Sequence, residues 1–437
     1  MAAADHHQCG EPEREAAAEL ERREPEQEWL ALGPARHLLA LALLSLVALA
    51  LYHPVLVRPR EHADETIYAA AAALIAAGES PFQVPGYYYP AAFAYAWAAT
   101  ERISFLLPAW IVWRVANLAA AVLLVWLAAI HLPGAGRRWW LRPLLCAPLL
   151  AAPGIALALR TGNLSVLTAT MVAGGVLAAG HRWMAGGLLL GSSVALKPFA
   201  LPALVALLAP RLAGKRRAGA RLPGEQPAGK HLAGKHAAGE RIADRWLGPE
   251  QRAGLLGIVL AGATLLGPPY AHELLTQPIE TLSTIRTVSF DRLLRLLGLP
   301  LPRFVVLGVV YAMLAGAATL WTRSRLERQL VAFAGAMVAA PLVWSHTMIL
   351  GLPMLTLALA CHAPDLASRA PADRRPRLVA LAVFALVALQ LCFQPGGFDH
   401  HAVPVQILFA TPMLAAPPLT ATLVIRRLRA DAVLPGG

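Results

Sequence analysis

Long apolar runs separated by polar segments dominate the chain. The first apolar run covers about residues 37–57. Further runs follow at about 89–107, 108–131, 143–159, 161–180, 184–208, 253–272, 304–321, 330–343, 345–361, 378–394 and 405–425. A helix of about 20 apolar residues is long enough to cross the hydrocarbon core of a bilayer. The pattern therefore predicts an all-α polytopic membrane protein with about 12 transmembrane helices.

The composition agrees with this pattern and excludes several other classes of protein. Of the 437 residues, 57% are apolar and 15% are charged, and the mean hydropathy is +0.54. Soluble domains carry about 25% charged residues. These values exclude a soluble enzyme of this length, a disordered chain and a collagen-like chain. The four cysteines show no paired spacing, so we expect neither a disulfide framework nor a zinc site.

The net charge of +12 indicates topology rather than a nucleic-acid partner. With a cytoplasmic N-terminus, the inner segments hold 24 of the 38 Lys and Arg residues, as the positive-inside rule favours. We therefore expect a multi-pass protein of the plasma membrane with both termini cytoplasmic. Arg137, Arg138 and Arg142 fall on the outer side in this arrangement. They leave open whether a span between residues 90 and 160 is short or re-entrant.

The polar segments divide the chain into regions. These are a charged cytoplasmic tail (1–36), an N-terminal transmembrane module (37–208), a basic low-complexity cytoplasmic loop (209–252), a C-terminal transmembrane module (253–425) and a second tail (426–437). The first outer loop covers residues 58–88. Its alanine-rich stretch begins beside Asp64, and a carboxylate at this position favours a helix over 63–77.

Charged groups inside or beside a membrane are costly, so each needs a physical reason. Asp64 and Glu65 directly follow the first apolar run. Lys197 lies far from both ends of its run, and Pro198 beside it interrupts helical hydrogen bonding. Snorkelling to the interface is the simpler interpretation for three further charges, Glu101, Arg102 and Arg114.

These polar groups suit the transfer of a sugar from a phosphate carrier. A leaving phosphate needs cations around it, and an attacking hydroxyl needs a carboxylate or an imidazole. A sugar needs aromatic faces and hydrogen-bond partners. Outer aromatic and imidazole side chains that offer these are Tyr87, Tyr88, Tyr89, Trp344 and His346.

Other reaction classes find no support in the sequence. It contains no P-loop, no dinucleotide-binding fingerprint and no G-x-S-x-G motif. Asp399, His400 and His401 are adjacent, but neighbouring histidines in a short loop rarely give a metal the geometry it needs. We therefore expect neither a cofactor nor a metal site.

Several motifs, in this order along the chain, resemble those of glycosyltransferase family 87. The first outer loop contains Asp64-x-x-x-Tyr68, Gly78-x-x-Pro81-Phe82 and Tyr88-Tyr89-Pro90. Later motifs are Gly162-Asn163-Leu164-Ser165, Ala185-Gly186 with Gly191 and Lys197-Pro198, the stretch 289–298, and Pro341-Leu342-Val343-Trp344-Ser345-His346. The family belongs to the GT-C superfamily and uses polyprenyl-phosphate sugars. It includes mannosyltransferases of actinobacterial phosphatidylinositol mannoside synthesis.

The chain also departs from the family pattern. Ala91 stands where the family has the second proline of Tyr-Pro-Pro, and Thr347 stands where it has the second histidine of a pair. Asn163 and Ser165 replace a glutamine and an asparagine. These departures affect what the resemblance implies about the identity of the acceptor and the donor sugar. They leave Asp64, Lys197 and His346 in place.

The resemblance, which covers about residues 37–360, implies a GT-C-type fold with an outer-loop helix after the first span. It implies that Asp64 is the general base for the acceptor hydroxyl. It implies donor-phosphate binding by Lys197, His346 and Arg292, and substrate binding by Tyr68, Tyr88, Tyr89, Asn163, Ser289 and Trp344. The partners would be a polyprenyl-phosphate sugar donor, with mannose as the sugar, and a glycolipid or glycan acceptor at the outer membrane face.

Alternatives to these roles remain open at this stage. Asp64 as a helix cap, His346 as an interfacial histidine, Arg292 as a surface charge and Trp344 as an interface anchor are structural interpretations. At the level of the whole protein, the rivals are a multispan transporter or flippase of polar lipids and a non-catalytic assembly partner. Transporters often contain two related halves, and no such repeat occurs in this sequence.

Overall fold

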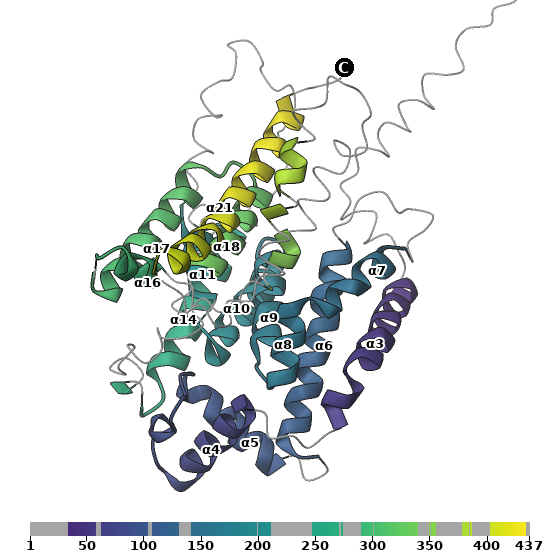
Figure 1. Ribbon diagram of the computed structural model, residues 1–437, viewed down its shortest axis with the longest axis vertical. Coiled ribbons are helices and arrows are strands. Elements are labelled where there is room, and N and C mark those ends of the chain that lie inside the picture. The colour runs from purple at the N-terminus through teal and green to yellow at the C-terminus, as the bar shows by residue number, and fades with distance from the viewer. Residues whose placement is uncertain are drawn as a thin grey trace, which may run out of the picture.

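A computed structural model of the chain shows a bundle of helices (Figure 1). The structure describes residues 34–57, 63–103, 107–130, 141–198, 200–210, 247–270, 272–273, 290–299, 301–339, 349, 351–354, 378–383, 385–386 and 403–433. Within these ranges the chain forms helices and turns and contains no β-strand. The predicted all-α class is therefore confirmed for the described part of the chain.

The helices of the N-terminal half are α3 (Pro34–Val57), α4 (Ala63–Ala77), α5 (Ala91–Ile103), α6 (Ala109–Ile130), α7 (Leu141–Cys146), α8 (Pro153–Thr161), α9 (Ser165–Ala178), α10 (Trp183–Leu196) and α11 (Ala200–Leu208). Two short 3₁₀ helices lie among them, η1 (Pro81–Gln83) and η2 (Ala147–Ala151). The C-terminal half contributes α14 (Pro249–Leu266), α16 (Phe290–Leu296), α17 (Arg303–Leu320), α18 (Arg325–Val338) and α21 (Val403–Val433).

Two of the described helices, α3 and α6, are long and apolar enough to cross a membrane. A third span is formed if α7 with η2 and α8, which meet at a bend of 58°, cross together. This bent pair lies within the interval whose topology the sequence leaves open, and Arg142 in α7 is buried. Among the described residues the expected total of about 12 spans is not confirmed.

The interruption that Pro198 predicts within the apolar run 184–208 is confirmed. Helix α10 ends at Leu196 and α11 begins at Ala200. Pro198 lacks the backbone N–H that a continuing helix would need, and Lys197 before it is extended, with φ −156° and ψ 142°. Lys197 therefore lies at a helix terminus.

The predicted cytoplasmic loop 209–252 is shorter than expected at its far end. Helix α14 begins at Pro249, so the charged residues Glu250 and Arg252 belong to its first turn. Proline is favoured at such a position because its missing N–H would be unpaired there in any case. Residues 211–246 of this loop lie outside the described residues.

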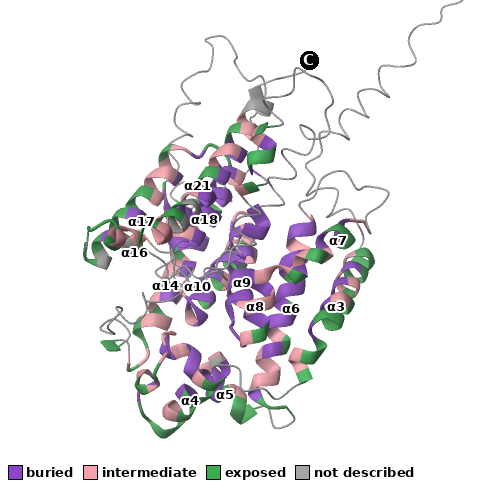
Figure 2. Cartoon of the chain, in the orientation of Figure 1, coloured by how far each residue is buried: buried purple, intermediate pink, exposed green. Residues whose placement is uncertain are grey.

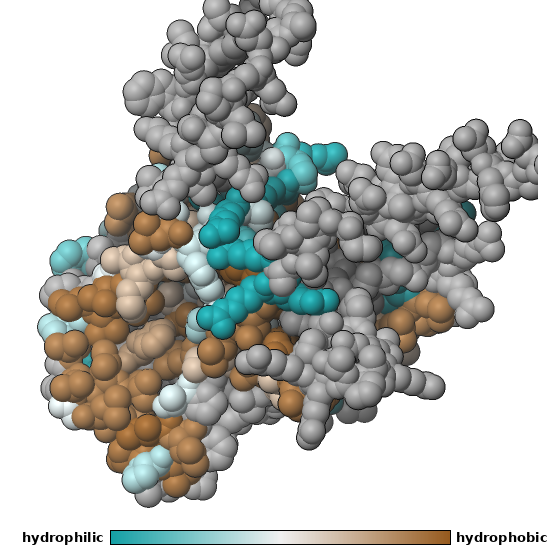
Figure 3. Space-filling model, turned by 90° about the horizontal axis from the view of Figure 1, so that it is seen from above, coloured by the Kyte–Doolittle hydropathy of each residue, from teal (hydrophilic) through white to brown (hydrophobic). Residues whose placement is uncertain are grey.

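Buried side chains concentrate along α6, α9, α10 and α11, whereas α3 exposes much of its surface (Figure 2). On α3 the exposed residues include large apolar ones, among them Leu38 and Leu46. Seen from above, apolar side chains also cover much of the described surface, and polar side chains gather in one strip beside them (Figure 3). An apolar exterior around a packed interior is what a lipid solvent selects.

The helix predicted over residues 63–77 is confirmed as α4 (Ala63–Ala77). It packs against α5, and the two helices cover one end of α6, α8 and α9 (Figure 1). A separate apolar cluster fills the space beneath α4, with Tyr68, Tyr87, Phe93 and Trp97 at its centre. This cluster holds α4 against the rest of the bundle.

Close packing of α10 on α14 depends on glycines. A methyl group added at Gly191 would lie 2.5 Å from Cβ of Leu260 and 3.0 Å from the carbonyl oxygen of Gly257, whereas one added at Gly262 would meet no atom within 4 Å. We expect Gly191→Ala to lower the free energy of unfolding by about 1–3 kcal/mol through overpacking. Gly262→Ala should leave it unchanged or raise it by up to about 1 kcal/mol, because alanine favours helices.

Thermal unfolding of both variants in detergent checks this prediction. Equal behaviour of the two alanine variants would contradict the close contact between α10 and α14.

Candidate functional site

The site begins at the first turn of α4, where Asp64 and Glu65 lie side by side in the sequence. Carboxylates are favoured at a helix N-terminus because backbone N–H groups point outward there. Asp64 is partly exposed, whereas Glu65 is buried. The oxygen Oδ2 of Asp64 accepts a hydrogen bond of 2.7 Å from Nδ2 of Asn163. This bond links α4 to the turn between α8 and α9.

That turn is shaped by Gly162 and Asn163. Gly162 ends α8 in the left-handed conformation, with φ +70°, which glycine adopts at little cost. The side-chain oxygen of Asn163 then accepts a hydrogen bond of 3.0 Å from the backbone N–H of Ser165, two residues further on. Asparagine commonly forms this local bond in turns. As a result the Asn163 amide is held at the start of α9.

Lys197 approaches the same amide from the break between α10 and α11. Its Nζ donates to Oδ1 of Asn163 at 2.6 Å and to Oγ of Ser165 at 2.7 Å. The Ser165 hydroxyl in turn donates to Oδ1 of Asn163 at 2.5 Å. All three side chains are buried. One amide therefore connects the carboxylate of Asp64 with the ammonium group of Lys197.

Aromatic side chains close this cluster on one side. The Tyr68 hydroxyl donates to the Tyr89 hydroxyl at 2.8 Å, and the Tyr89 hydroxyl accepts from Nδ2 of Asn163 at 3.4 Å. Nζ of Lys197 lies 5.1 Å from the centre of the Tyr89 ring, within reach of a cation–π interaction. Burial, with Tyr89 and Asp64 nearby, raises the pKa of Tyr68 well above its ordinary value, so its hydroxyl stays protonated.

The structure thus brings together five of the residues singled out from the sequence, namely Asp64, Tyr68, Tyr89, Asn163 and Lys197. Tyr88 is only half buried. Tyr87, considered for a sugar contact, is fully buried and donates its hydroxyl to the carbonyl oxygen of Pro90. Ser289, Trp344, His346 and the cluster 399–401 lie outside the described residues, as does the side chain of Arg292.

Sequence reasoning missed the residues that support the cluster. Asn117 of α6 donates to the carbonyl oxygen of Asn163 at 2.8 Å and accepts from the backbone N–H of Leu167 at 3.0 Å. A lone amide inside the apolar run 108–131 was the signal that could have pointed to it. Ser165 was seen only as a departure from a family pattern, although it binds Lys197.

The snorkelling interpretation of Arg114 is wrong. Arg114 is 4% exposed, and its guanidinium group forms a two-pronged ion pair with Glu65, with both N–O distances 2.6 Å. Its third nitrogen donates to the carbonyl oxygen of Val55 at 2.9 Å. The partner that turns this arginine inward lies 49 residues earlier in the chain.

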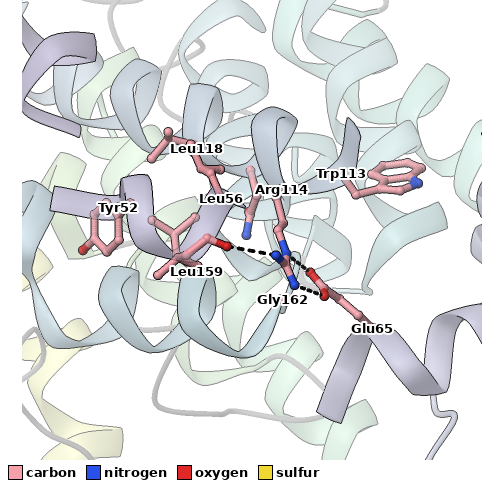
Figure 4. A pocket seen from close by; sticks show the side chains of 10 residues that line it. Tyr52, Leu56, Glu65, Trp113, Arg114, Leu118, Leu159 and Gly162 are labelled. Atoms are coloured by element: carbon pink, nitrogen blue, oxygen red, sulfur yellow. Dashed lines mark hydrogen bonds and ion pairs between the residues drawn. The ribbon is translucent and has the colours of Figure 1, made fainter. Parts of the chain in front are cut away.

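A pocket lies beside this ion pair (Figure 4). Glu65, Arg114 and Gly162 line it, together with Tyr52, Val55, Leu56, Trp113, Asn117, Leu118 and Leu159. Neither Asp64 nor Lys197 contributes to its lining. Figure 4 shows the carboxylate of Glu65 and the guanidinium group of Arg114 facing one another. The first turn of α4 therefore presents its two acids to different surroundings.

Comparison with known families gives one match. The family model described as glycosyltransferase family 87 matches residues 87–222, a segment that contains Tyr89, Asn163 and Lys197. This segment, which makes up less than half of the chain, is similar to glycosyltransferase family 87. The similarity indicates a membrane glycosyltransferase, an enzyme that uses a sugar donor and an acceptor. No curated protein matches the chain.

Asn163 supplies a hydrogen-bond acceptor to the buried ammonium group of Lys197. We expect Asn163→Ala to lower the free energy of unfolding by about 1–3 kcal/mol, because Lys197 loses an acceptor while it stays buried. Thr170→Ala, which removes a buried hydroxyl from helix α9 directly after this turn, should lower the free energy of unfolding by less. The double variant Asn163→Ala/Lys197→Met should be more stable than Asn163→Ala, because no buried charge remains.

Chemical denaturation of the three variants measures these differences. A double variant less stable than Asn163→Ala would show that Asn163 does not serve to satisfy Lys197.

Proposed function

We propose that this protein is a membrane glycosyltransferase that moves a sugar from a polyprenyl-phosphate donor to a glycolipid or glycan acceptor at the outer face of the membrane. The observation that carries the proposal is the pair of contacts at Asn163, which join one carboxylate and one cation. The transfer of a sugar from a phosphate needs a base for the incoming hydroxyl and positive charge for the outgoing oxygen. Asp64 and Lys197 provide one of each.

Asp64 is the proposed general base. It is partly exposed and carries a donor, Asn163, on one oxygen. As the acceptor oxygen attacks the anomeric carbon, its proton passes to the carboxylate of Asp64, and the bond from that carbon to the phosphate oxygen breaks. A single displacement of this kind inverts the anomeric configuration, unlike the two steps of a retaining hydrolase.

Lys197 is the proposed cation for the departing phosphate. Its ammonium group is already oriented by Asn163 and Ser165, so little reorganisation is needed when negative charge develops. Because the phosphate leaves as an anion, the reaction needs no general acid. Arg292 and His346 are proposed as further cations at the phosphate. Tyr68, Tyr88, Tyr89, Ser289 and Trp344 are proposed to contact the sugar or the acceptor, and mannose is the proposed sugar.

Asp64→Asn should reduce the turnover rate by about 10²–10⁴-fold, which is the range for loss of a general base. The amide keeps the size of the side chain, so folding should be preserved. Glu79→Gln is the matched control, because Glu79 is an exposed acid in the same outer loop and should leave the rate unchanged. Radiolabelled sugar transfer by the purified variants measures both; an active Asp64→Asn variant would refute the assignment of the base.

Lys197→Met should lower turnover with a polyprenyl-phosphate sugar by about 10²–10³-fold, the typical loss when one preorganised charge-stabilising group is removed. The measurement compares polyprenyl-phosphate mannose, polyprenyl-phosphate glucose and a nucleotide sugar as donors for the purified protein. Mannose transfer from the lipid donor alone supports the proposal. Use of the nucleotide sugar would contradict it, and lipid movement across vesicles without sugar transfer would favour the flippase alternative.

A further inference from the structure

We propose that the ion pair between Glu65 and Arg114 is a positioning unit for Asp64. It fixes the first turn of α4 against α6, so that the Asp64 carboxylate is held at its bond with Asn163. This inference rests on the proposed function, in which Asp64 is the base. Neither Glu65 nor Arg114 is proposed to touch the substrates.

The ion pair has a geometry that restricts movement. Nε and one terminal nitrogen of Arg114 each donate to a different oxygen of Glu65, both at 2.6 Å. Such a two-pronged pair fixes the orientation of both planar groups as well as their distance. The guanidinium carbon also lies 4.3 Å from the centre of the Trp110 ring. Arg114 is thus held from two directions.

The pair joins three helices at one point. Glu65 belongs to α4 and Arg114 to α6, and the carbonyl oxygen of Val55 that Arg114 also binds lies near the end of α3. Both charged side chains are buried, with exposed fractions of 3% and 9%. Breaking a buried ion pair leaves a charge uncompensated. Moving the first turn of α4 away from α6 would therefore cost a large free energy.

Two neighbouring residues of α4 are held by two neighbouring residues of the turn after α8. Asp64 binds the Asn163 side chain, and Glu65 packs on Gly162. A methyl group added at Gly162 would lie 2.4 Å from Cγ of Glu65. Because the two acids are adjacent in α4, a displacement of Glu65 also displaces Asp64. A misplacement of a reacting group by about 1 Å can cost about 100-fold in rate.

Glu65 itself is unsuited to be the base. Both of its oxygens already accept hydrogen bonds from Arg114, and its side chain is buried on the pocket side of the turn (Figure 4). Asp64, in contrast, is partly exposed. Glu65 therefore has the positioning role, and Asp64 has the role of accepting the proton.

The test uses the purified full-length protein and compares Glu65→Gln with Glu327→Gln. The second variant breaks another ion pair, in which the buried Glu327 accepts from Nε of the partly exposed Arg429 at 2.9 Å, at the start of α18 and away from α4. Both variants should lose thermal stability. Glu65→Gln should also lower kcat by about 10- to 100-fold, with the KM of donor and acceptor changed less than about threefold. Glu327→Gln should leave kcat unchanged.

Two further measurements distinguish the possible causes of a lower kcat in Glu65→Gln. Arg114→Gln and the double variant Glu65→Gln/Arg114→Gln should lower kcat no more than Glu65→Gln alone, since either change removes the same unit. Hydrogen exchange of the α4 backbone should become faster in Glu65→Gln and not in Glu327→Gln. If Glu65→Gln does not fold, Arg114→Lys, which keeps the charge and loses the fork, replaces it with the same expected results.

The outcomes distinguish this inference from the proposed function. An inactive Asp64→Asn variant with normal kcat in Glu65→Gln would overturn the positioning role alone. An equal loss of kcat in Glu327→Gln would also overturn it, because the effect would then be one of general stability. A fully active Asp64→Asn variant would overturn the base assignment, while faster exchange of α4 in Glu65→Gln would still support the ion pair as the element that fixes α4.

Discussion

A buried ammonium group must be given hydrogen-bond acceptors, and the arrangement of this site follows from how Lys197 obtains them. The helix break at Pro198 brings Lys197 to the end of α10, and Asn163 and Ser165 supply the acceptors. Because an amide has an oxygen at one end and an NH₂ group at the other, Asn163 can also bind Asp64. The need to satisfy one cation therefore determines where the carboxylate lies.

The first turn of α4 shows how one short segment serves two purposes. Successive residues of a helix point about 100° apart, so Asp64 and Glu65 face different surroundings. Asp64 meets the amide of Asn163, and Glu65 meets the guanidinium group of Arg114. The family match of residues 87–222 includes Asn163 and Arg114 but neither of the two acids that they bind.

Part of this arrangement could be predicted from local pattern. The helix over 63–77 has its boundaries in the sequence, with acids at its start and glycine directly after its end. The break near Lys197 was visible as Pro198. Hydropathy averaged over a window shows only an unbroken apolar run over 184–208, because it does not register one missing N–H, so the break was predicted from the proline itself. Arg114 was misread because its partner, Glu65, is 49 residues away in the sequence.

By itself the sequence determined the membrane class, the family resemblance and the costly polar residues worth explaining, since these depend on composition and local spacing. Only the tertiary structure decided which of those residues meet. The contact of Asp64 with Asn163 spans 99 residues, and that of Lys197 with Asn163 spans 34. Hydrogen bonds and ion pairs require atoms to approach within about 3 Å, and that proximity is set by how the helices pack rather than by their order along the chain.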